Sequence, residues 1–231
     1  MRKAPLSSDC GGVLTRLRSA AVLAFWIHLI AGAAMALVLR RGLETNPNLQ
    51  DRLTFIVHQR ALWIVGWLTW TGAAIAVIYF YTVFSSTHRL GRLAVLVAAA
   101  GITADFSGQA IEIGVLPEVA ARILGLTAGI HLFNTVDRAA VMMSGCIGNG
   151  MYSLSALILA WRTRHIYPKW VCSAGIAAGC FGLALSVAAL MNSVPGMLWT
   201  NVFLVPCILS WLAGVAFTVT VTATGGSDSV L

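Results

Sequence analysis

An aspartate stands in the middle of an apolar stretch that is long enough to cross a membrane. Asp105 lies near the centre of the run from 93 to 115. Placing an ionised aspartate at that depth costs at least about 2.5 to 3.5 kcal/mol on insertion scales, so the side chain must face other helices, find partners or stay protonated. Its type and depth therefore point to proton binding or to recognition of a polar ligand.

Two other polar residues are expected at the same depth as Asp105. A helix rises about 1.5 Å per residue, which places His28 near the centre of the run from 20 to 39 and Asn149 near the centre of the run from 139 to 161. The shared layer predicts a buried site with Asp105 as the protonatable centre and His28 and Asn149 as its partners. The alternative is a neutral Asp105 that only fixes helix packing.

Further polar side chains extend from Asp105 toward the predicted outer surface. Gln109 and Glu112 follow at positions i+4 and i+7, so the three lie on one helix face, with Glu112 about 10 Å nearer the surface. This spacing predicts a polar path to the buried layer. It also makes Asp105 and Glu112 the candidate acids if the protein is an enzyme.

A second polar group is expected where the third and fourth apolar runs approach the outer surface. Its members are Glu118, Arg122, His131, Asp137 and Arg138. One interpretation is a salt-bridge network that tethers a short helix, although exposed pairs contribute little to stability. The alternative is an entrance that selects a polar or zwitterionic solute. No metal is expected, because the sequence has no HxxxH or ExxH spacing.

Three tryptophans form one face of the second apolar run. Trp63, Trp67 and Trp70 recur at i, i+4 and i+7, the spacing of a single helix face. Such a face usually serves packing or lipid contact. If it instead lies beside the Asp105 layer, an aromatic wall next to a buried acid would suit an isoprenoid-like substrate that is protonated or isomerised by acid catalysis.

Six apolar runs must position these residues. The chain has 231 residues, of which 58% are hydrophobic and 10% charged, and a mean hydropathy of +0.84, which leaves too little polar surface for a water-soluble globule. Each run has about the 20 residues that a transmembrane helix needs: 20 to 39, 61 to 84, 93 to 115, 139 to 161, 170 to 192 and 198 to 223. We therefore expect an all-α, polytopic transmembrane bundle in one domain, 20 to 223, between an N-terminal arm, 1 to 19, and a C-terminal tail, 224 to 231.

Two connecting segments are expected to form short helices at the membrane surface. One is "LQDRLTFIVHQR", residues 49 to 60, which leads into the second run. The other, Val119 to Asn134, is too short for a confident span and is interrupted by Arg122. Pro117 should end the third helix before it. The prediction is six spans plus one short interfacial or re-entrant helix over 119 to 134, with a seventh crossing as the alternative.

The distribution of basic residues indicates the orientation. With six spans and the N-terminus inside, the cytoplasmic segments carry nine Lys or Arg and the opposite side six. The positive-inside rule then favours cytoplasmic N- and C-termini in the plasma (inner) membrane of a bacterium. These cations flank apolar runs and form no stripe with interleaved aromatics, so the lipid bilayer is the expected partner and nucleic acid is not.

The sequence offers no obvious ligands for haem or retinal, two common membrane cofactors. Only His28 is deep enough to hold a haem between helices, which disfavours a bis-histidine haem. Both lysines, Lys3 and Lys169, lie outside the runs, which disfavours a retinal Schiff base. The cofactor, if any, is unknown.

The order of segments resembles an uncharacterised family of bacterial six-helix integral membrane proteins, a domain of unknown function. The relevant features are a short N-terminal arm, one span, a polar loop followed by "HQRALWIVGWLTW", and "YPKWVCSAGIAAGCFGLAL" at the fifth span. The resemblance implies a fold class and no activity.

Three functions fit these observations. The first is a small proton-linked transporter or ligand-binding membrane protein. The second is a membrane-embedded enzyme that acts on a lipophilic substrate. The third is a noncatalytic accessory subunit, and the sequence leaves oligomerisation or membership of a complex open.

Overall fold

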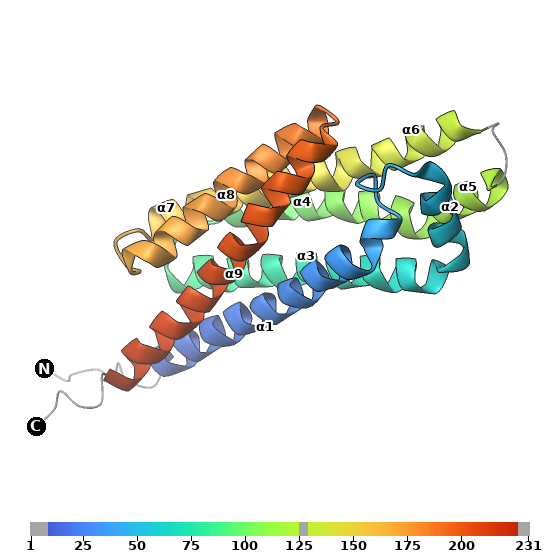
Figure 1. The fold of residues 1–231 in the computed structure, drawn as a ribbon. Coiled ribbons are helices and arrows are strands. Elements are labelled where there is room, and N and C mark those ends of the chain that lie inside the picture. The colour runs from blue at the N-terminus through green and yellow to red at the C-terminus, as the bar shows by residue number, and fades with distance from the viewer. Residues whose placement is uncertain (1–8, 125–128, 226–231) are drawn as a thin grey trace, which may run out of the picture.

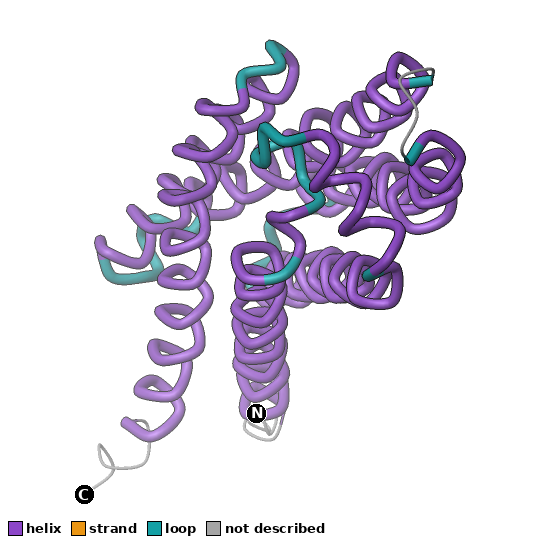
Figure 2. Tube along the Cα trace, turned by 45° about the vertical axis from the view of Figure 1, so that its right-hand side comes forward, coloured by secondary structure: helices purple, strands orange, loops and turns teal. Residues whose placement is uncertain are grey.

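A computed structural model describes residues 9 to 124 and 129 to 225, and every element in that part of the chain is helical (Figures 1 and 2). In chain order they are α1 (Asp9–Leu37), the 3-10 turn η1 (Leu39–Arg41), α2 (Leu49–His58), α3 (Arg60–Thr87), α4 (Leu93–Ala110), the π-helical turn η2 (Ile111–Val115), α5 (Leu116–Ile123), α6 (Ile130–Val141), the π-helical segment η3 (Met142–Gly148), α7 (Asn149–Arg162), α8 (Lys169–Leu190) and α9 (Val194–Gly225). The all-α prediction is confirmed. Residues 1 to 8 of the predicted arm and 226 to 231 of the predicted tail lie outside the described residues.

Six helical stretches are long and apolar enough to cross a membrane, as the sequence predicted. They are Gly11–Arg41, Arg60–Thr87, Leu93–Ile123, Ile130–Arg162, Lys169–Leu190 and Val194–Val219. Each packs against its neighbour in the chain, and α9 also packs against α1, so the six form a closed ring. This arrangement makes the chain an integral membrane protein.

The bundle has two different ends (Figure 1). We call the end where α1 begins and α3 meets α4 the proximal end, and the opposite end, where α2 packs against α5, the distal end. The proximal core is aromatic, with Trp211 of α9 in edge contact with Phe80 and Phe84 of α3. A separate distal core collects apolar side chains of α2, α3, α5 and α6.

The third and fourth spans are longer than predicted. The α4, η2 and α5 segments form one continuous stretch, Leu93–Ile123, and α6, η3 and α7 form another, Ile130–Arg162. The described residues of the segment from 119 to 134 therefore belong mainly to the ends of α5 and α6 and form no separate interfacial helix. Residues 125 to 128 lie outside the described part. The short helix at this end of the bundle is α2, which the sequence also predicted.

The helix continues through Pro117, contrary to prediction, because of a π-helical turn. In that turn the Leu116 N–H donates to the Ile111 carbonyl, five residues back. The same register would pair the carbonyl of Glu112 with residue 117, which has no N–H because it is proline. The indole Nε1–H of Trp63 donates to this carbonyl instead, at 2.7 Å. A side chain of α3 thus satisfies the backbone group that Pro117 leaves free.

This contact gives a first prediction. The substitution Trp63→Phe keeps an aromatic ring but leaves the buried Glu112 carbonyl unpaired, and it should lower the free energy of unfolding by about 1.5 kcal/mol. The matched control is Trp67→Phe, because the Trp67 indole nitrogen is buried without a partner. Denaturant titration in mixed micelles, followed by circular dichroism, compares the two. Equal losses would show that the Trp63 hydrogen bond contributes nothing.

Candidate functional site

The polar stripe, defined as Asp105, Gln109 and Glu112, is buried along α4 and η2. The three residues are 9%, 3% and 2% exposed, although they lie in an apolar membrane span. Helical spacing places them on one face, and that face is turned toward neighbouring helices. The stripe therefore runs inside the bundle from the middle of the span to its distal end.

Asp105 is held between two neighbouring helices. The Tyr152 hydroxyl of α7 donates to Asp105 Oδ2 at 3.1 Å, and the Gln109 side chain interacts with the same carboxyl group. On the other side of the stripe, the Thr71 hydroxyl of α3 donates to Gln109 Oε1 at 2.5 Å. The stripe thus links α3, α4 and α7 through side-chain hydrogen bonds.

The structure does not bring the predicted partners His28 and Asn149 to Asp105. The ring of His28 is hydrogen-bonded through Nδ1 to the Ala24 carbonyl of its own helix, at 2.8 Å. The Asn149 amide donates to the Gly182 carbonyl of α8 at 2.7 Å and to the Ser186 hydroxyl. Equal depth did not imply contact, because depth does not specify the helix face on which a residue lies.

A buried ion pair closes the distal end of the bundle. Arg52 of α2 donates from Nη2 to Asp137 Oδ1 of α6 at 2.8 Å, and these side chains are only 8% and 13% exposed. Arg52 also donates from Nε to the Gly42 carbonyl, and its guanidinium lies over the ring of Phe133, 5.3 Å from the centroid. An interaction with a carboxylate, a carbonyl and an aromatic face holds the guanidinium in a fixed position.

Glu112 lies beside this ion pair with an unpaired oxygen. Its Oε2 is buried and has no hydrogen-bond partner, and its electrostatic neighbours are Asp137, Glu44 and Arg52. An ionised carboxylate without a partner in such surroundings is costly. Burial therefore favours the protonated acid, whose O–H is available as a donor.

Glu44 completes the group from the loop between η1 and α2. Burial, and secondly repulsion by Asp137, raise the pKa of the Glu44 carboxyl above its usual value, while attraction to Arg52 and Arg138 partly offsets the increase. We call Glu44, Arg52, Glu112 and Asp137 the distal charge cluster. If all four were ionised, three negative charges would face one positive charge.

The raised pKa of Glu44 predicts how stability depends on pH. The folded state binds this proton more tightly than the unfolded chain, so stability declines as the pH rises from the ordinary value of 4.5 through the raised pKa. Glu44→Gln removes that decline. The unfolding temperatures of the variant and the wild type are measured from acidic to neutral pH. The unfolding temperature of the variant relative to that of the wild type should increase as the pH increases. A constant difference at every pH would contradict the assignment.

The composition of the cluster limits its chemistry. Among the described residues, no group of three or more His, Cys, Asp or Glu is arranged to hold a metal ion. The cluster instead combines an ion pair with two further carboxyl groups, so its acidic residues outnumber its basic one. Such an arrangement can take up a proton or hold a cationic group.

The residues of the polar group predicted near the outer ends do not form one network. Glu118 pairs with Arg60 at 2.7 Å in an exposed position, while Asp137 belongs to the buried cluster. Arg138 donates to the Ala189 and Leu190 carbonyls at the C-terminus of α8. Arg122 and His131 are exposed. Only Asp137 lies within the candidate site.

The three tryptophans pack in the distal core, beside the cluster. Trp63 and Trp67 meet edge to face with ring centroids 5.7 Å apart, and Trp70 is packed against the same core. The aromatic face therefore lies next to Glu112, through the bond from Trp63 to the Glu112 carbonyl, and not at a histidine and asparagine site.

Arg52 and Glu44 were not among the site residues that the sequence predicted. A signal for Arg52 was present, because it is followed at i+3 and i+4 by the buried Phe55 and Ile56, which places an arginine on the apolar face of α2. A charged residue on such a face requires a partner. No comparable signal marks Glu44. Its position in the cluster depends on the conformation of the loop between η1 and α2.

The fold and the site together define a class of protein: a polytopic helical membrane protein with a buried charge cluster at one end of the bundle. No protein-family model, curated protein or solved structure matches the chain.

Proposed function

We propose that this protein is a proton-linked membrane transporter or ligand-binding protein in which Glu112 carries the proton. One observation supports the proposal above the others: the Glu112 carboxyl is buried at 2% exposure with an oxygen that has no partner. Ionisable groups inside membrane spans commonly belong to proton relays or substrate pathways. Asp105, the centre favoured by the sequence, is hydrogen-bonded to Tyr152 and takes the role of an inner relay group.

The stripe suggests how a proton and a solute are coupled. With Glu112 protonated, the Arg52 and Asp137 pair remains balanced and the site carries little excess charge. Release of the proton adds a negative charge next to Asp137, which favours a cationic solute or a rearrangement of the ion pair. Differential affinity between these two charge states is what couples the solute to the proton.

Infrared difference spectra of the purified protein, recorded between acidic and alkaline buffers, test the proton site. The wild type should show a protonated carboxyl band that Glu112→Gln removes, whereas Asp105→Asn should retain the Glu112 band. An unchanged spectrum in Glu112→Gln would rule out Glu112 as the proton carrier.

Proteoliposomes that contain a pH-sensitive dye test transport itself. Cationic, zwitterionic and anionic solutes are added in turn, and a transported solute should dissipate the pH gradient with the wild type but not with Glu112→Gln. Equal proton fluxes in the two proteins for every solute would contradict coupling through Glu112.

The aromatic face beside Glu112 favours a second candidate, acid catalysis on a lipophilic substrate. Trp63 and Trp67 would then bind the apolar substrate while the Glu112 acid protonates it. A lipid product formed by the wild type and absent with Glu112→Gln, with no proton flux in either, would favour this alternative.

A further inference from the structure

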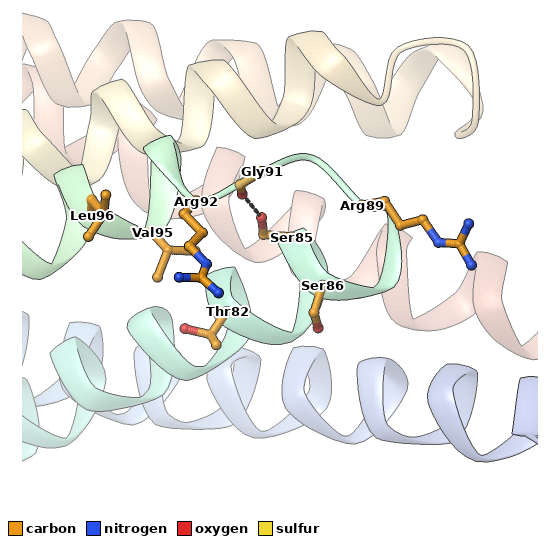
Figure 3. Close-up of a pocket in the computed structure, with 8 residues that line it drawn as sticks. All are labelled: Thr82, Ser85, Ser86, Arg89, Gly91, Arg92, Val95 and Leu96. Carbon is orange, nitrogen blue, oxygen red and sulfur yellow. Dashed lines mark hydrogen bonds between the residues drawn. The ribbon is translucent and has the colours of Figure 1, made fainter.

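A pocket of about 430 Å³ opens at the proximal end, where α3 ends and α4 begins (Figure 3). Its surface is largely apolar, and the residues that line it include Arg92, Thr82 and Ser86 together with Val95 and Leu96. In Figure 3 the Arg92 side chain points toward Thr82. A largely apolar pocket is thus bordered by an arginine and two hydroxyl-bearing residues.

The pocket lies at the boundary of the membrane. The second span ends at Thr87 and the third begins at Leu93, so Arg92 stands at the end of the apolar region while Leu96 lies one helical turn inside it. The pocket thus lies where two apolar spans meet a basic connecting loop.

The charge around the pocket is strongly positive. Within the described part of the chain, the segments 11 to 19, 85 to 92 and 162 to 169, which flank the spans, carry seven Lys or Arg and no Asp or Glu. No residue that lines the pocket is acidic. Basic residues near a membrane surface attract anionic lipids, each contributing about 1 kcal/mol.

The loop that forms the pocket is fixed in place. The Ser85 hydroxyl donates to the Gly91 carbonyl at 2.6 Å, and Gly91 has a φ of 80°, which glycine adopts without strain. His88, at the end of α3, is hydrogen-bonded to the Tyr167 hydroxyl at 2.8 Å. The pocket therefore needs little ordering before a ligand binds.

We propose that this pocket binds an anionic phospholipid with a hydroxyl-bearing headgroup, such as phosphatidylglycerol. Arg92 and the first N–H groups of α4 face the phosphate, where a guanidinium and a helix N-terminus both favour negative charge. The Thr82 and Ser86 hydroxyls already donate to the Ile78 and Val83 carbonyls, so their oxygens accept hydrogen bonds from the headgroup hydroxyls. One acyl chain lies along Val95 and Leu96.

A second pocket, of about 270 Å³, provides a comparison within the same molecule. It lies between α7 and α8 and is lined by Leu157, Ile158, Trp161 and Ile176, all of them apolar. A pocket of this kind accepts an acyl chain without selecting a headgroup. The preference for an anionic lipid is therefore assigned to the Arg92 pocket.

The test is native mass spectrometry of the protein released from vesicles that contain equal amounts of phosphatidylglycerol and phosphatidylcholine. The wild type should retain phosphatidylglycerol preferentially. Arg92→Gln should reduce that preference about fivefold, the equivalent of one basic residue at an anionic surface. Arg122→Gln is the matched control, because Arg122 is also exposed but lies in α5 at the distal end.

A second variant, Leu96→Trp, fills the pocket while keeping Arg92, and it should lose the lipid as well. If Arg92→Gln fails to fold, as judged by circular dichroism, Leu96→Trp still tests whether lipid binding depends on the pocket. Retention of phosphatidylglycerol by Leu96→Trp at the wild-type level would overturn the proposal, because the arginine would then act without the pocket. Displacement of the lipid by inorganic phosphate alone, at physiological ionic strength, would also overturn it in favour of a free-phosphate site.

Discussion

Replacing Arg52 with methionine is expected to lower the free energy of unfolding by about 3–5 kcal/mol, the usual cost of removing one partner of a buried ion pair. The methionine fills much of the same volume but donates no hydrogen bond. It leaves Asp137 buried beside Glu112 and Glu44, so three carboxyl groups lose their only strongly held cation. Denaturant titration in mixed micelles measures the loss.

A second arginine provides the matched control. Arg60 pairs with Glu118 at 2.7 Å, close to the 2.8 Å of the Arg52 pair, but its side chain is 47% exposed and that of Glu118 is 54% exposed. Water and salt screen such a pair, so Arg60→Met should cost less than about 1 kcal/mol. Equal losses in the two variants would mean that the Arg52 pair is not protected from solvent.

A double variant separates the charge from the packing. Arg52→Met combined with Asp137→Leu replaces the buried pair by apolar side chains, a change that is often neutral or stabilising in other proteins. We therefore expect the double variant to recover most of the stability that Arg52→Met loses. If the double variant is as stable as the wild type but does not couple protons to a solute, the Arg52–Asp137 pair serves function and not stability.

The sequence predicted the six spans because their signal is local. Twenty consecutive apolar residues are sufficient evidence for a membrane crossing, and α8 and α3 lie within a few residues of the predicted ranges. The first and fourth spans begin earlier than predicted, at Gly11 and Ile130. The predicted end of the third span was wrong because it depends on a tertiary contact. The bond from Trp63 to the Glu112 carbonyl, 49 residues away in the chain, allows the helix to pass Pro117.

The site was predicted only in part, for a related reason. Helical spacing on one segment placed Asp105, Gln109 and Glu112 on a common face, and the structure buries all three. Contacts between segments need the rotation of each helix about its own axis, which depth does not provide. His28 and Asn149 have hydrogen-bond partners other than Asp105. Arg52 comes from the short helix α2.

The two π-helical segments connect the fold to the site. The turn η2 contains Glu112, and η3 follows directly on α6, the helix that carries Asp137. π-Helical turns are uncommon and often occur at functional sites. Each one adds a residue to its helix and shifts the faces on either side of it. Of the carboxyl groups of the distal charge cluster, Glu112 thus lies within a change of helical register, and Asp137 lies in the helix that precedes one.

The close approach of these two helices predicts that Gly108→Ala will be strongly destabilising. A Cβ atom at Gly108 would lie 2.8 Å from the Ala140 carbonyl oxygen and 2.9 Å from the Ser144 backbone nitrogen. Backbone atoms cannot rotate away as a side chain can, so the helices must separate. We expect a loss of about 2–3 kcal/mol, the upper part of the range for overpacked sites.

Separation of the helices should also change the site. Gly108 lies between Asp105 and Glu112 in the chain, and α4 meets η3 again where Gly148 contacts Asp105. Gly108→Ala should therefore weaken the hydrogen bond from Tyr152 to Asp105 and shift the infrared band of the Asp105 carboxyl, as well as lower the stability.

Gly114 is the control, because it lies on the same span and a Cβ atom there would meet no atom within 4 Å. Alanine is the better helix former by up to about 1 kcal/mol, so Gly114→Ala should leave the stability unchanged or raise it. If Gly108→Ala matched Gly114→Ala in both stability and infrared spectrum, α4 and η3 would not be in backbone contact. The buried stripe would then lose the tight packing that keeps lipid and bulk water away from its carboxyl groups.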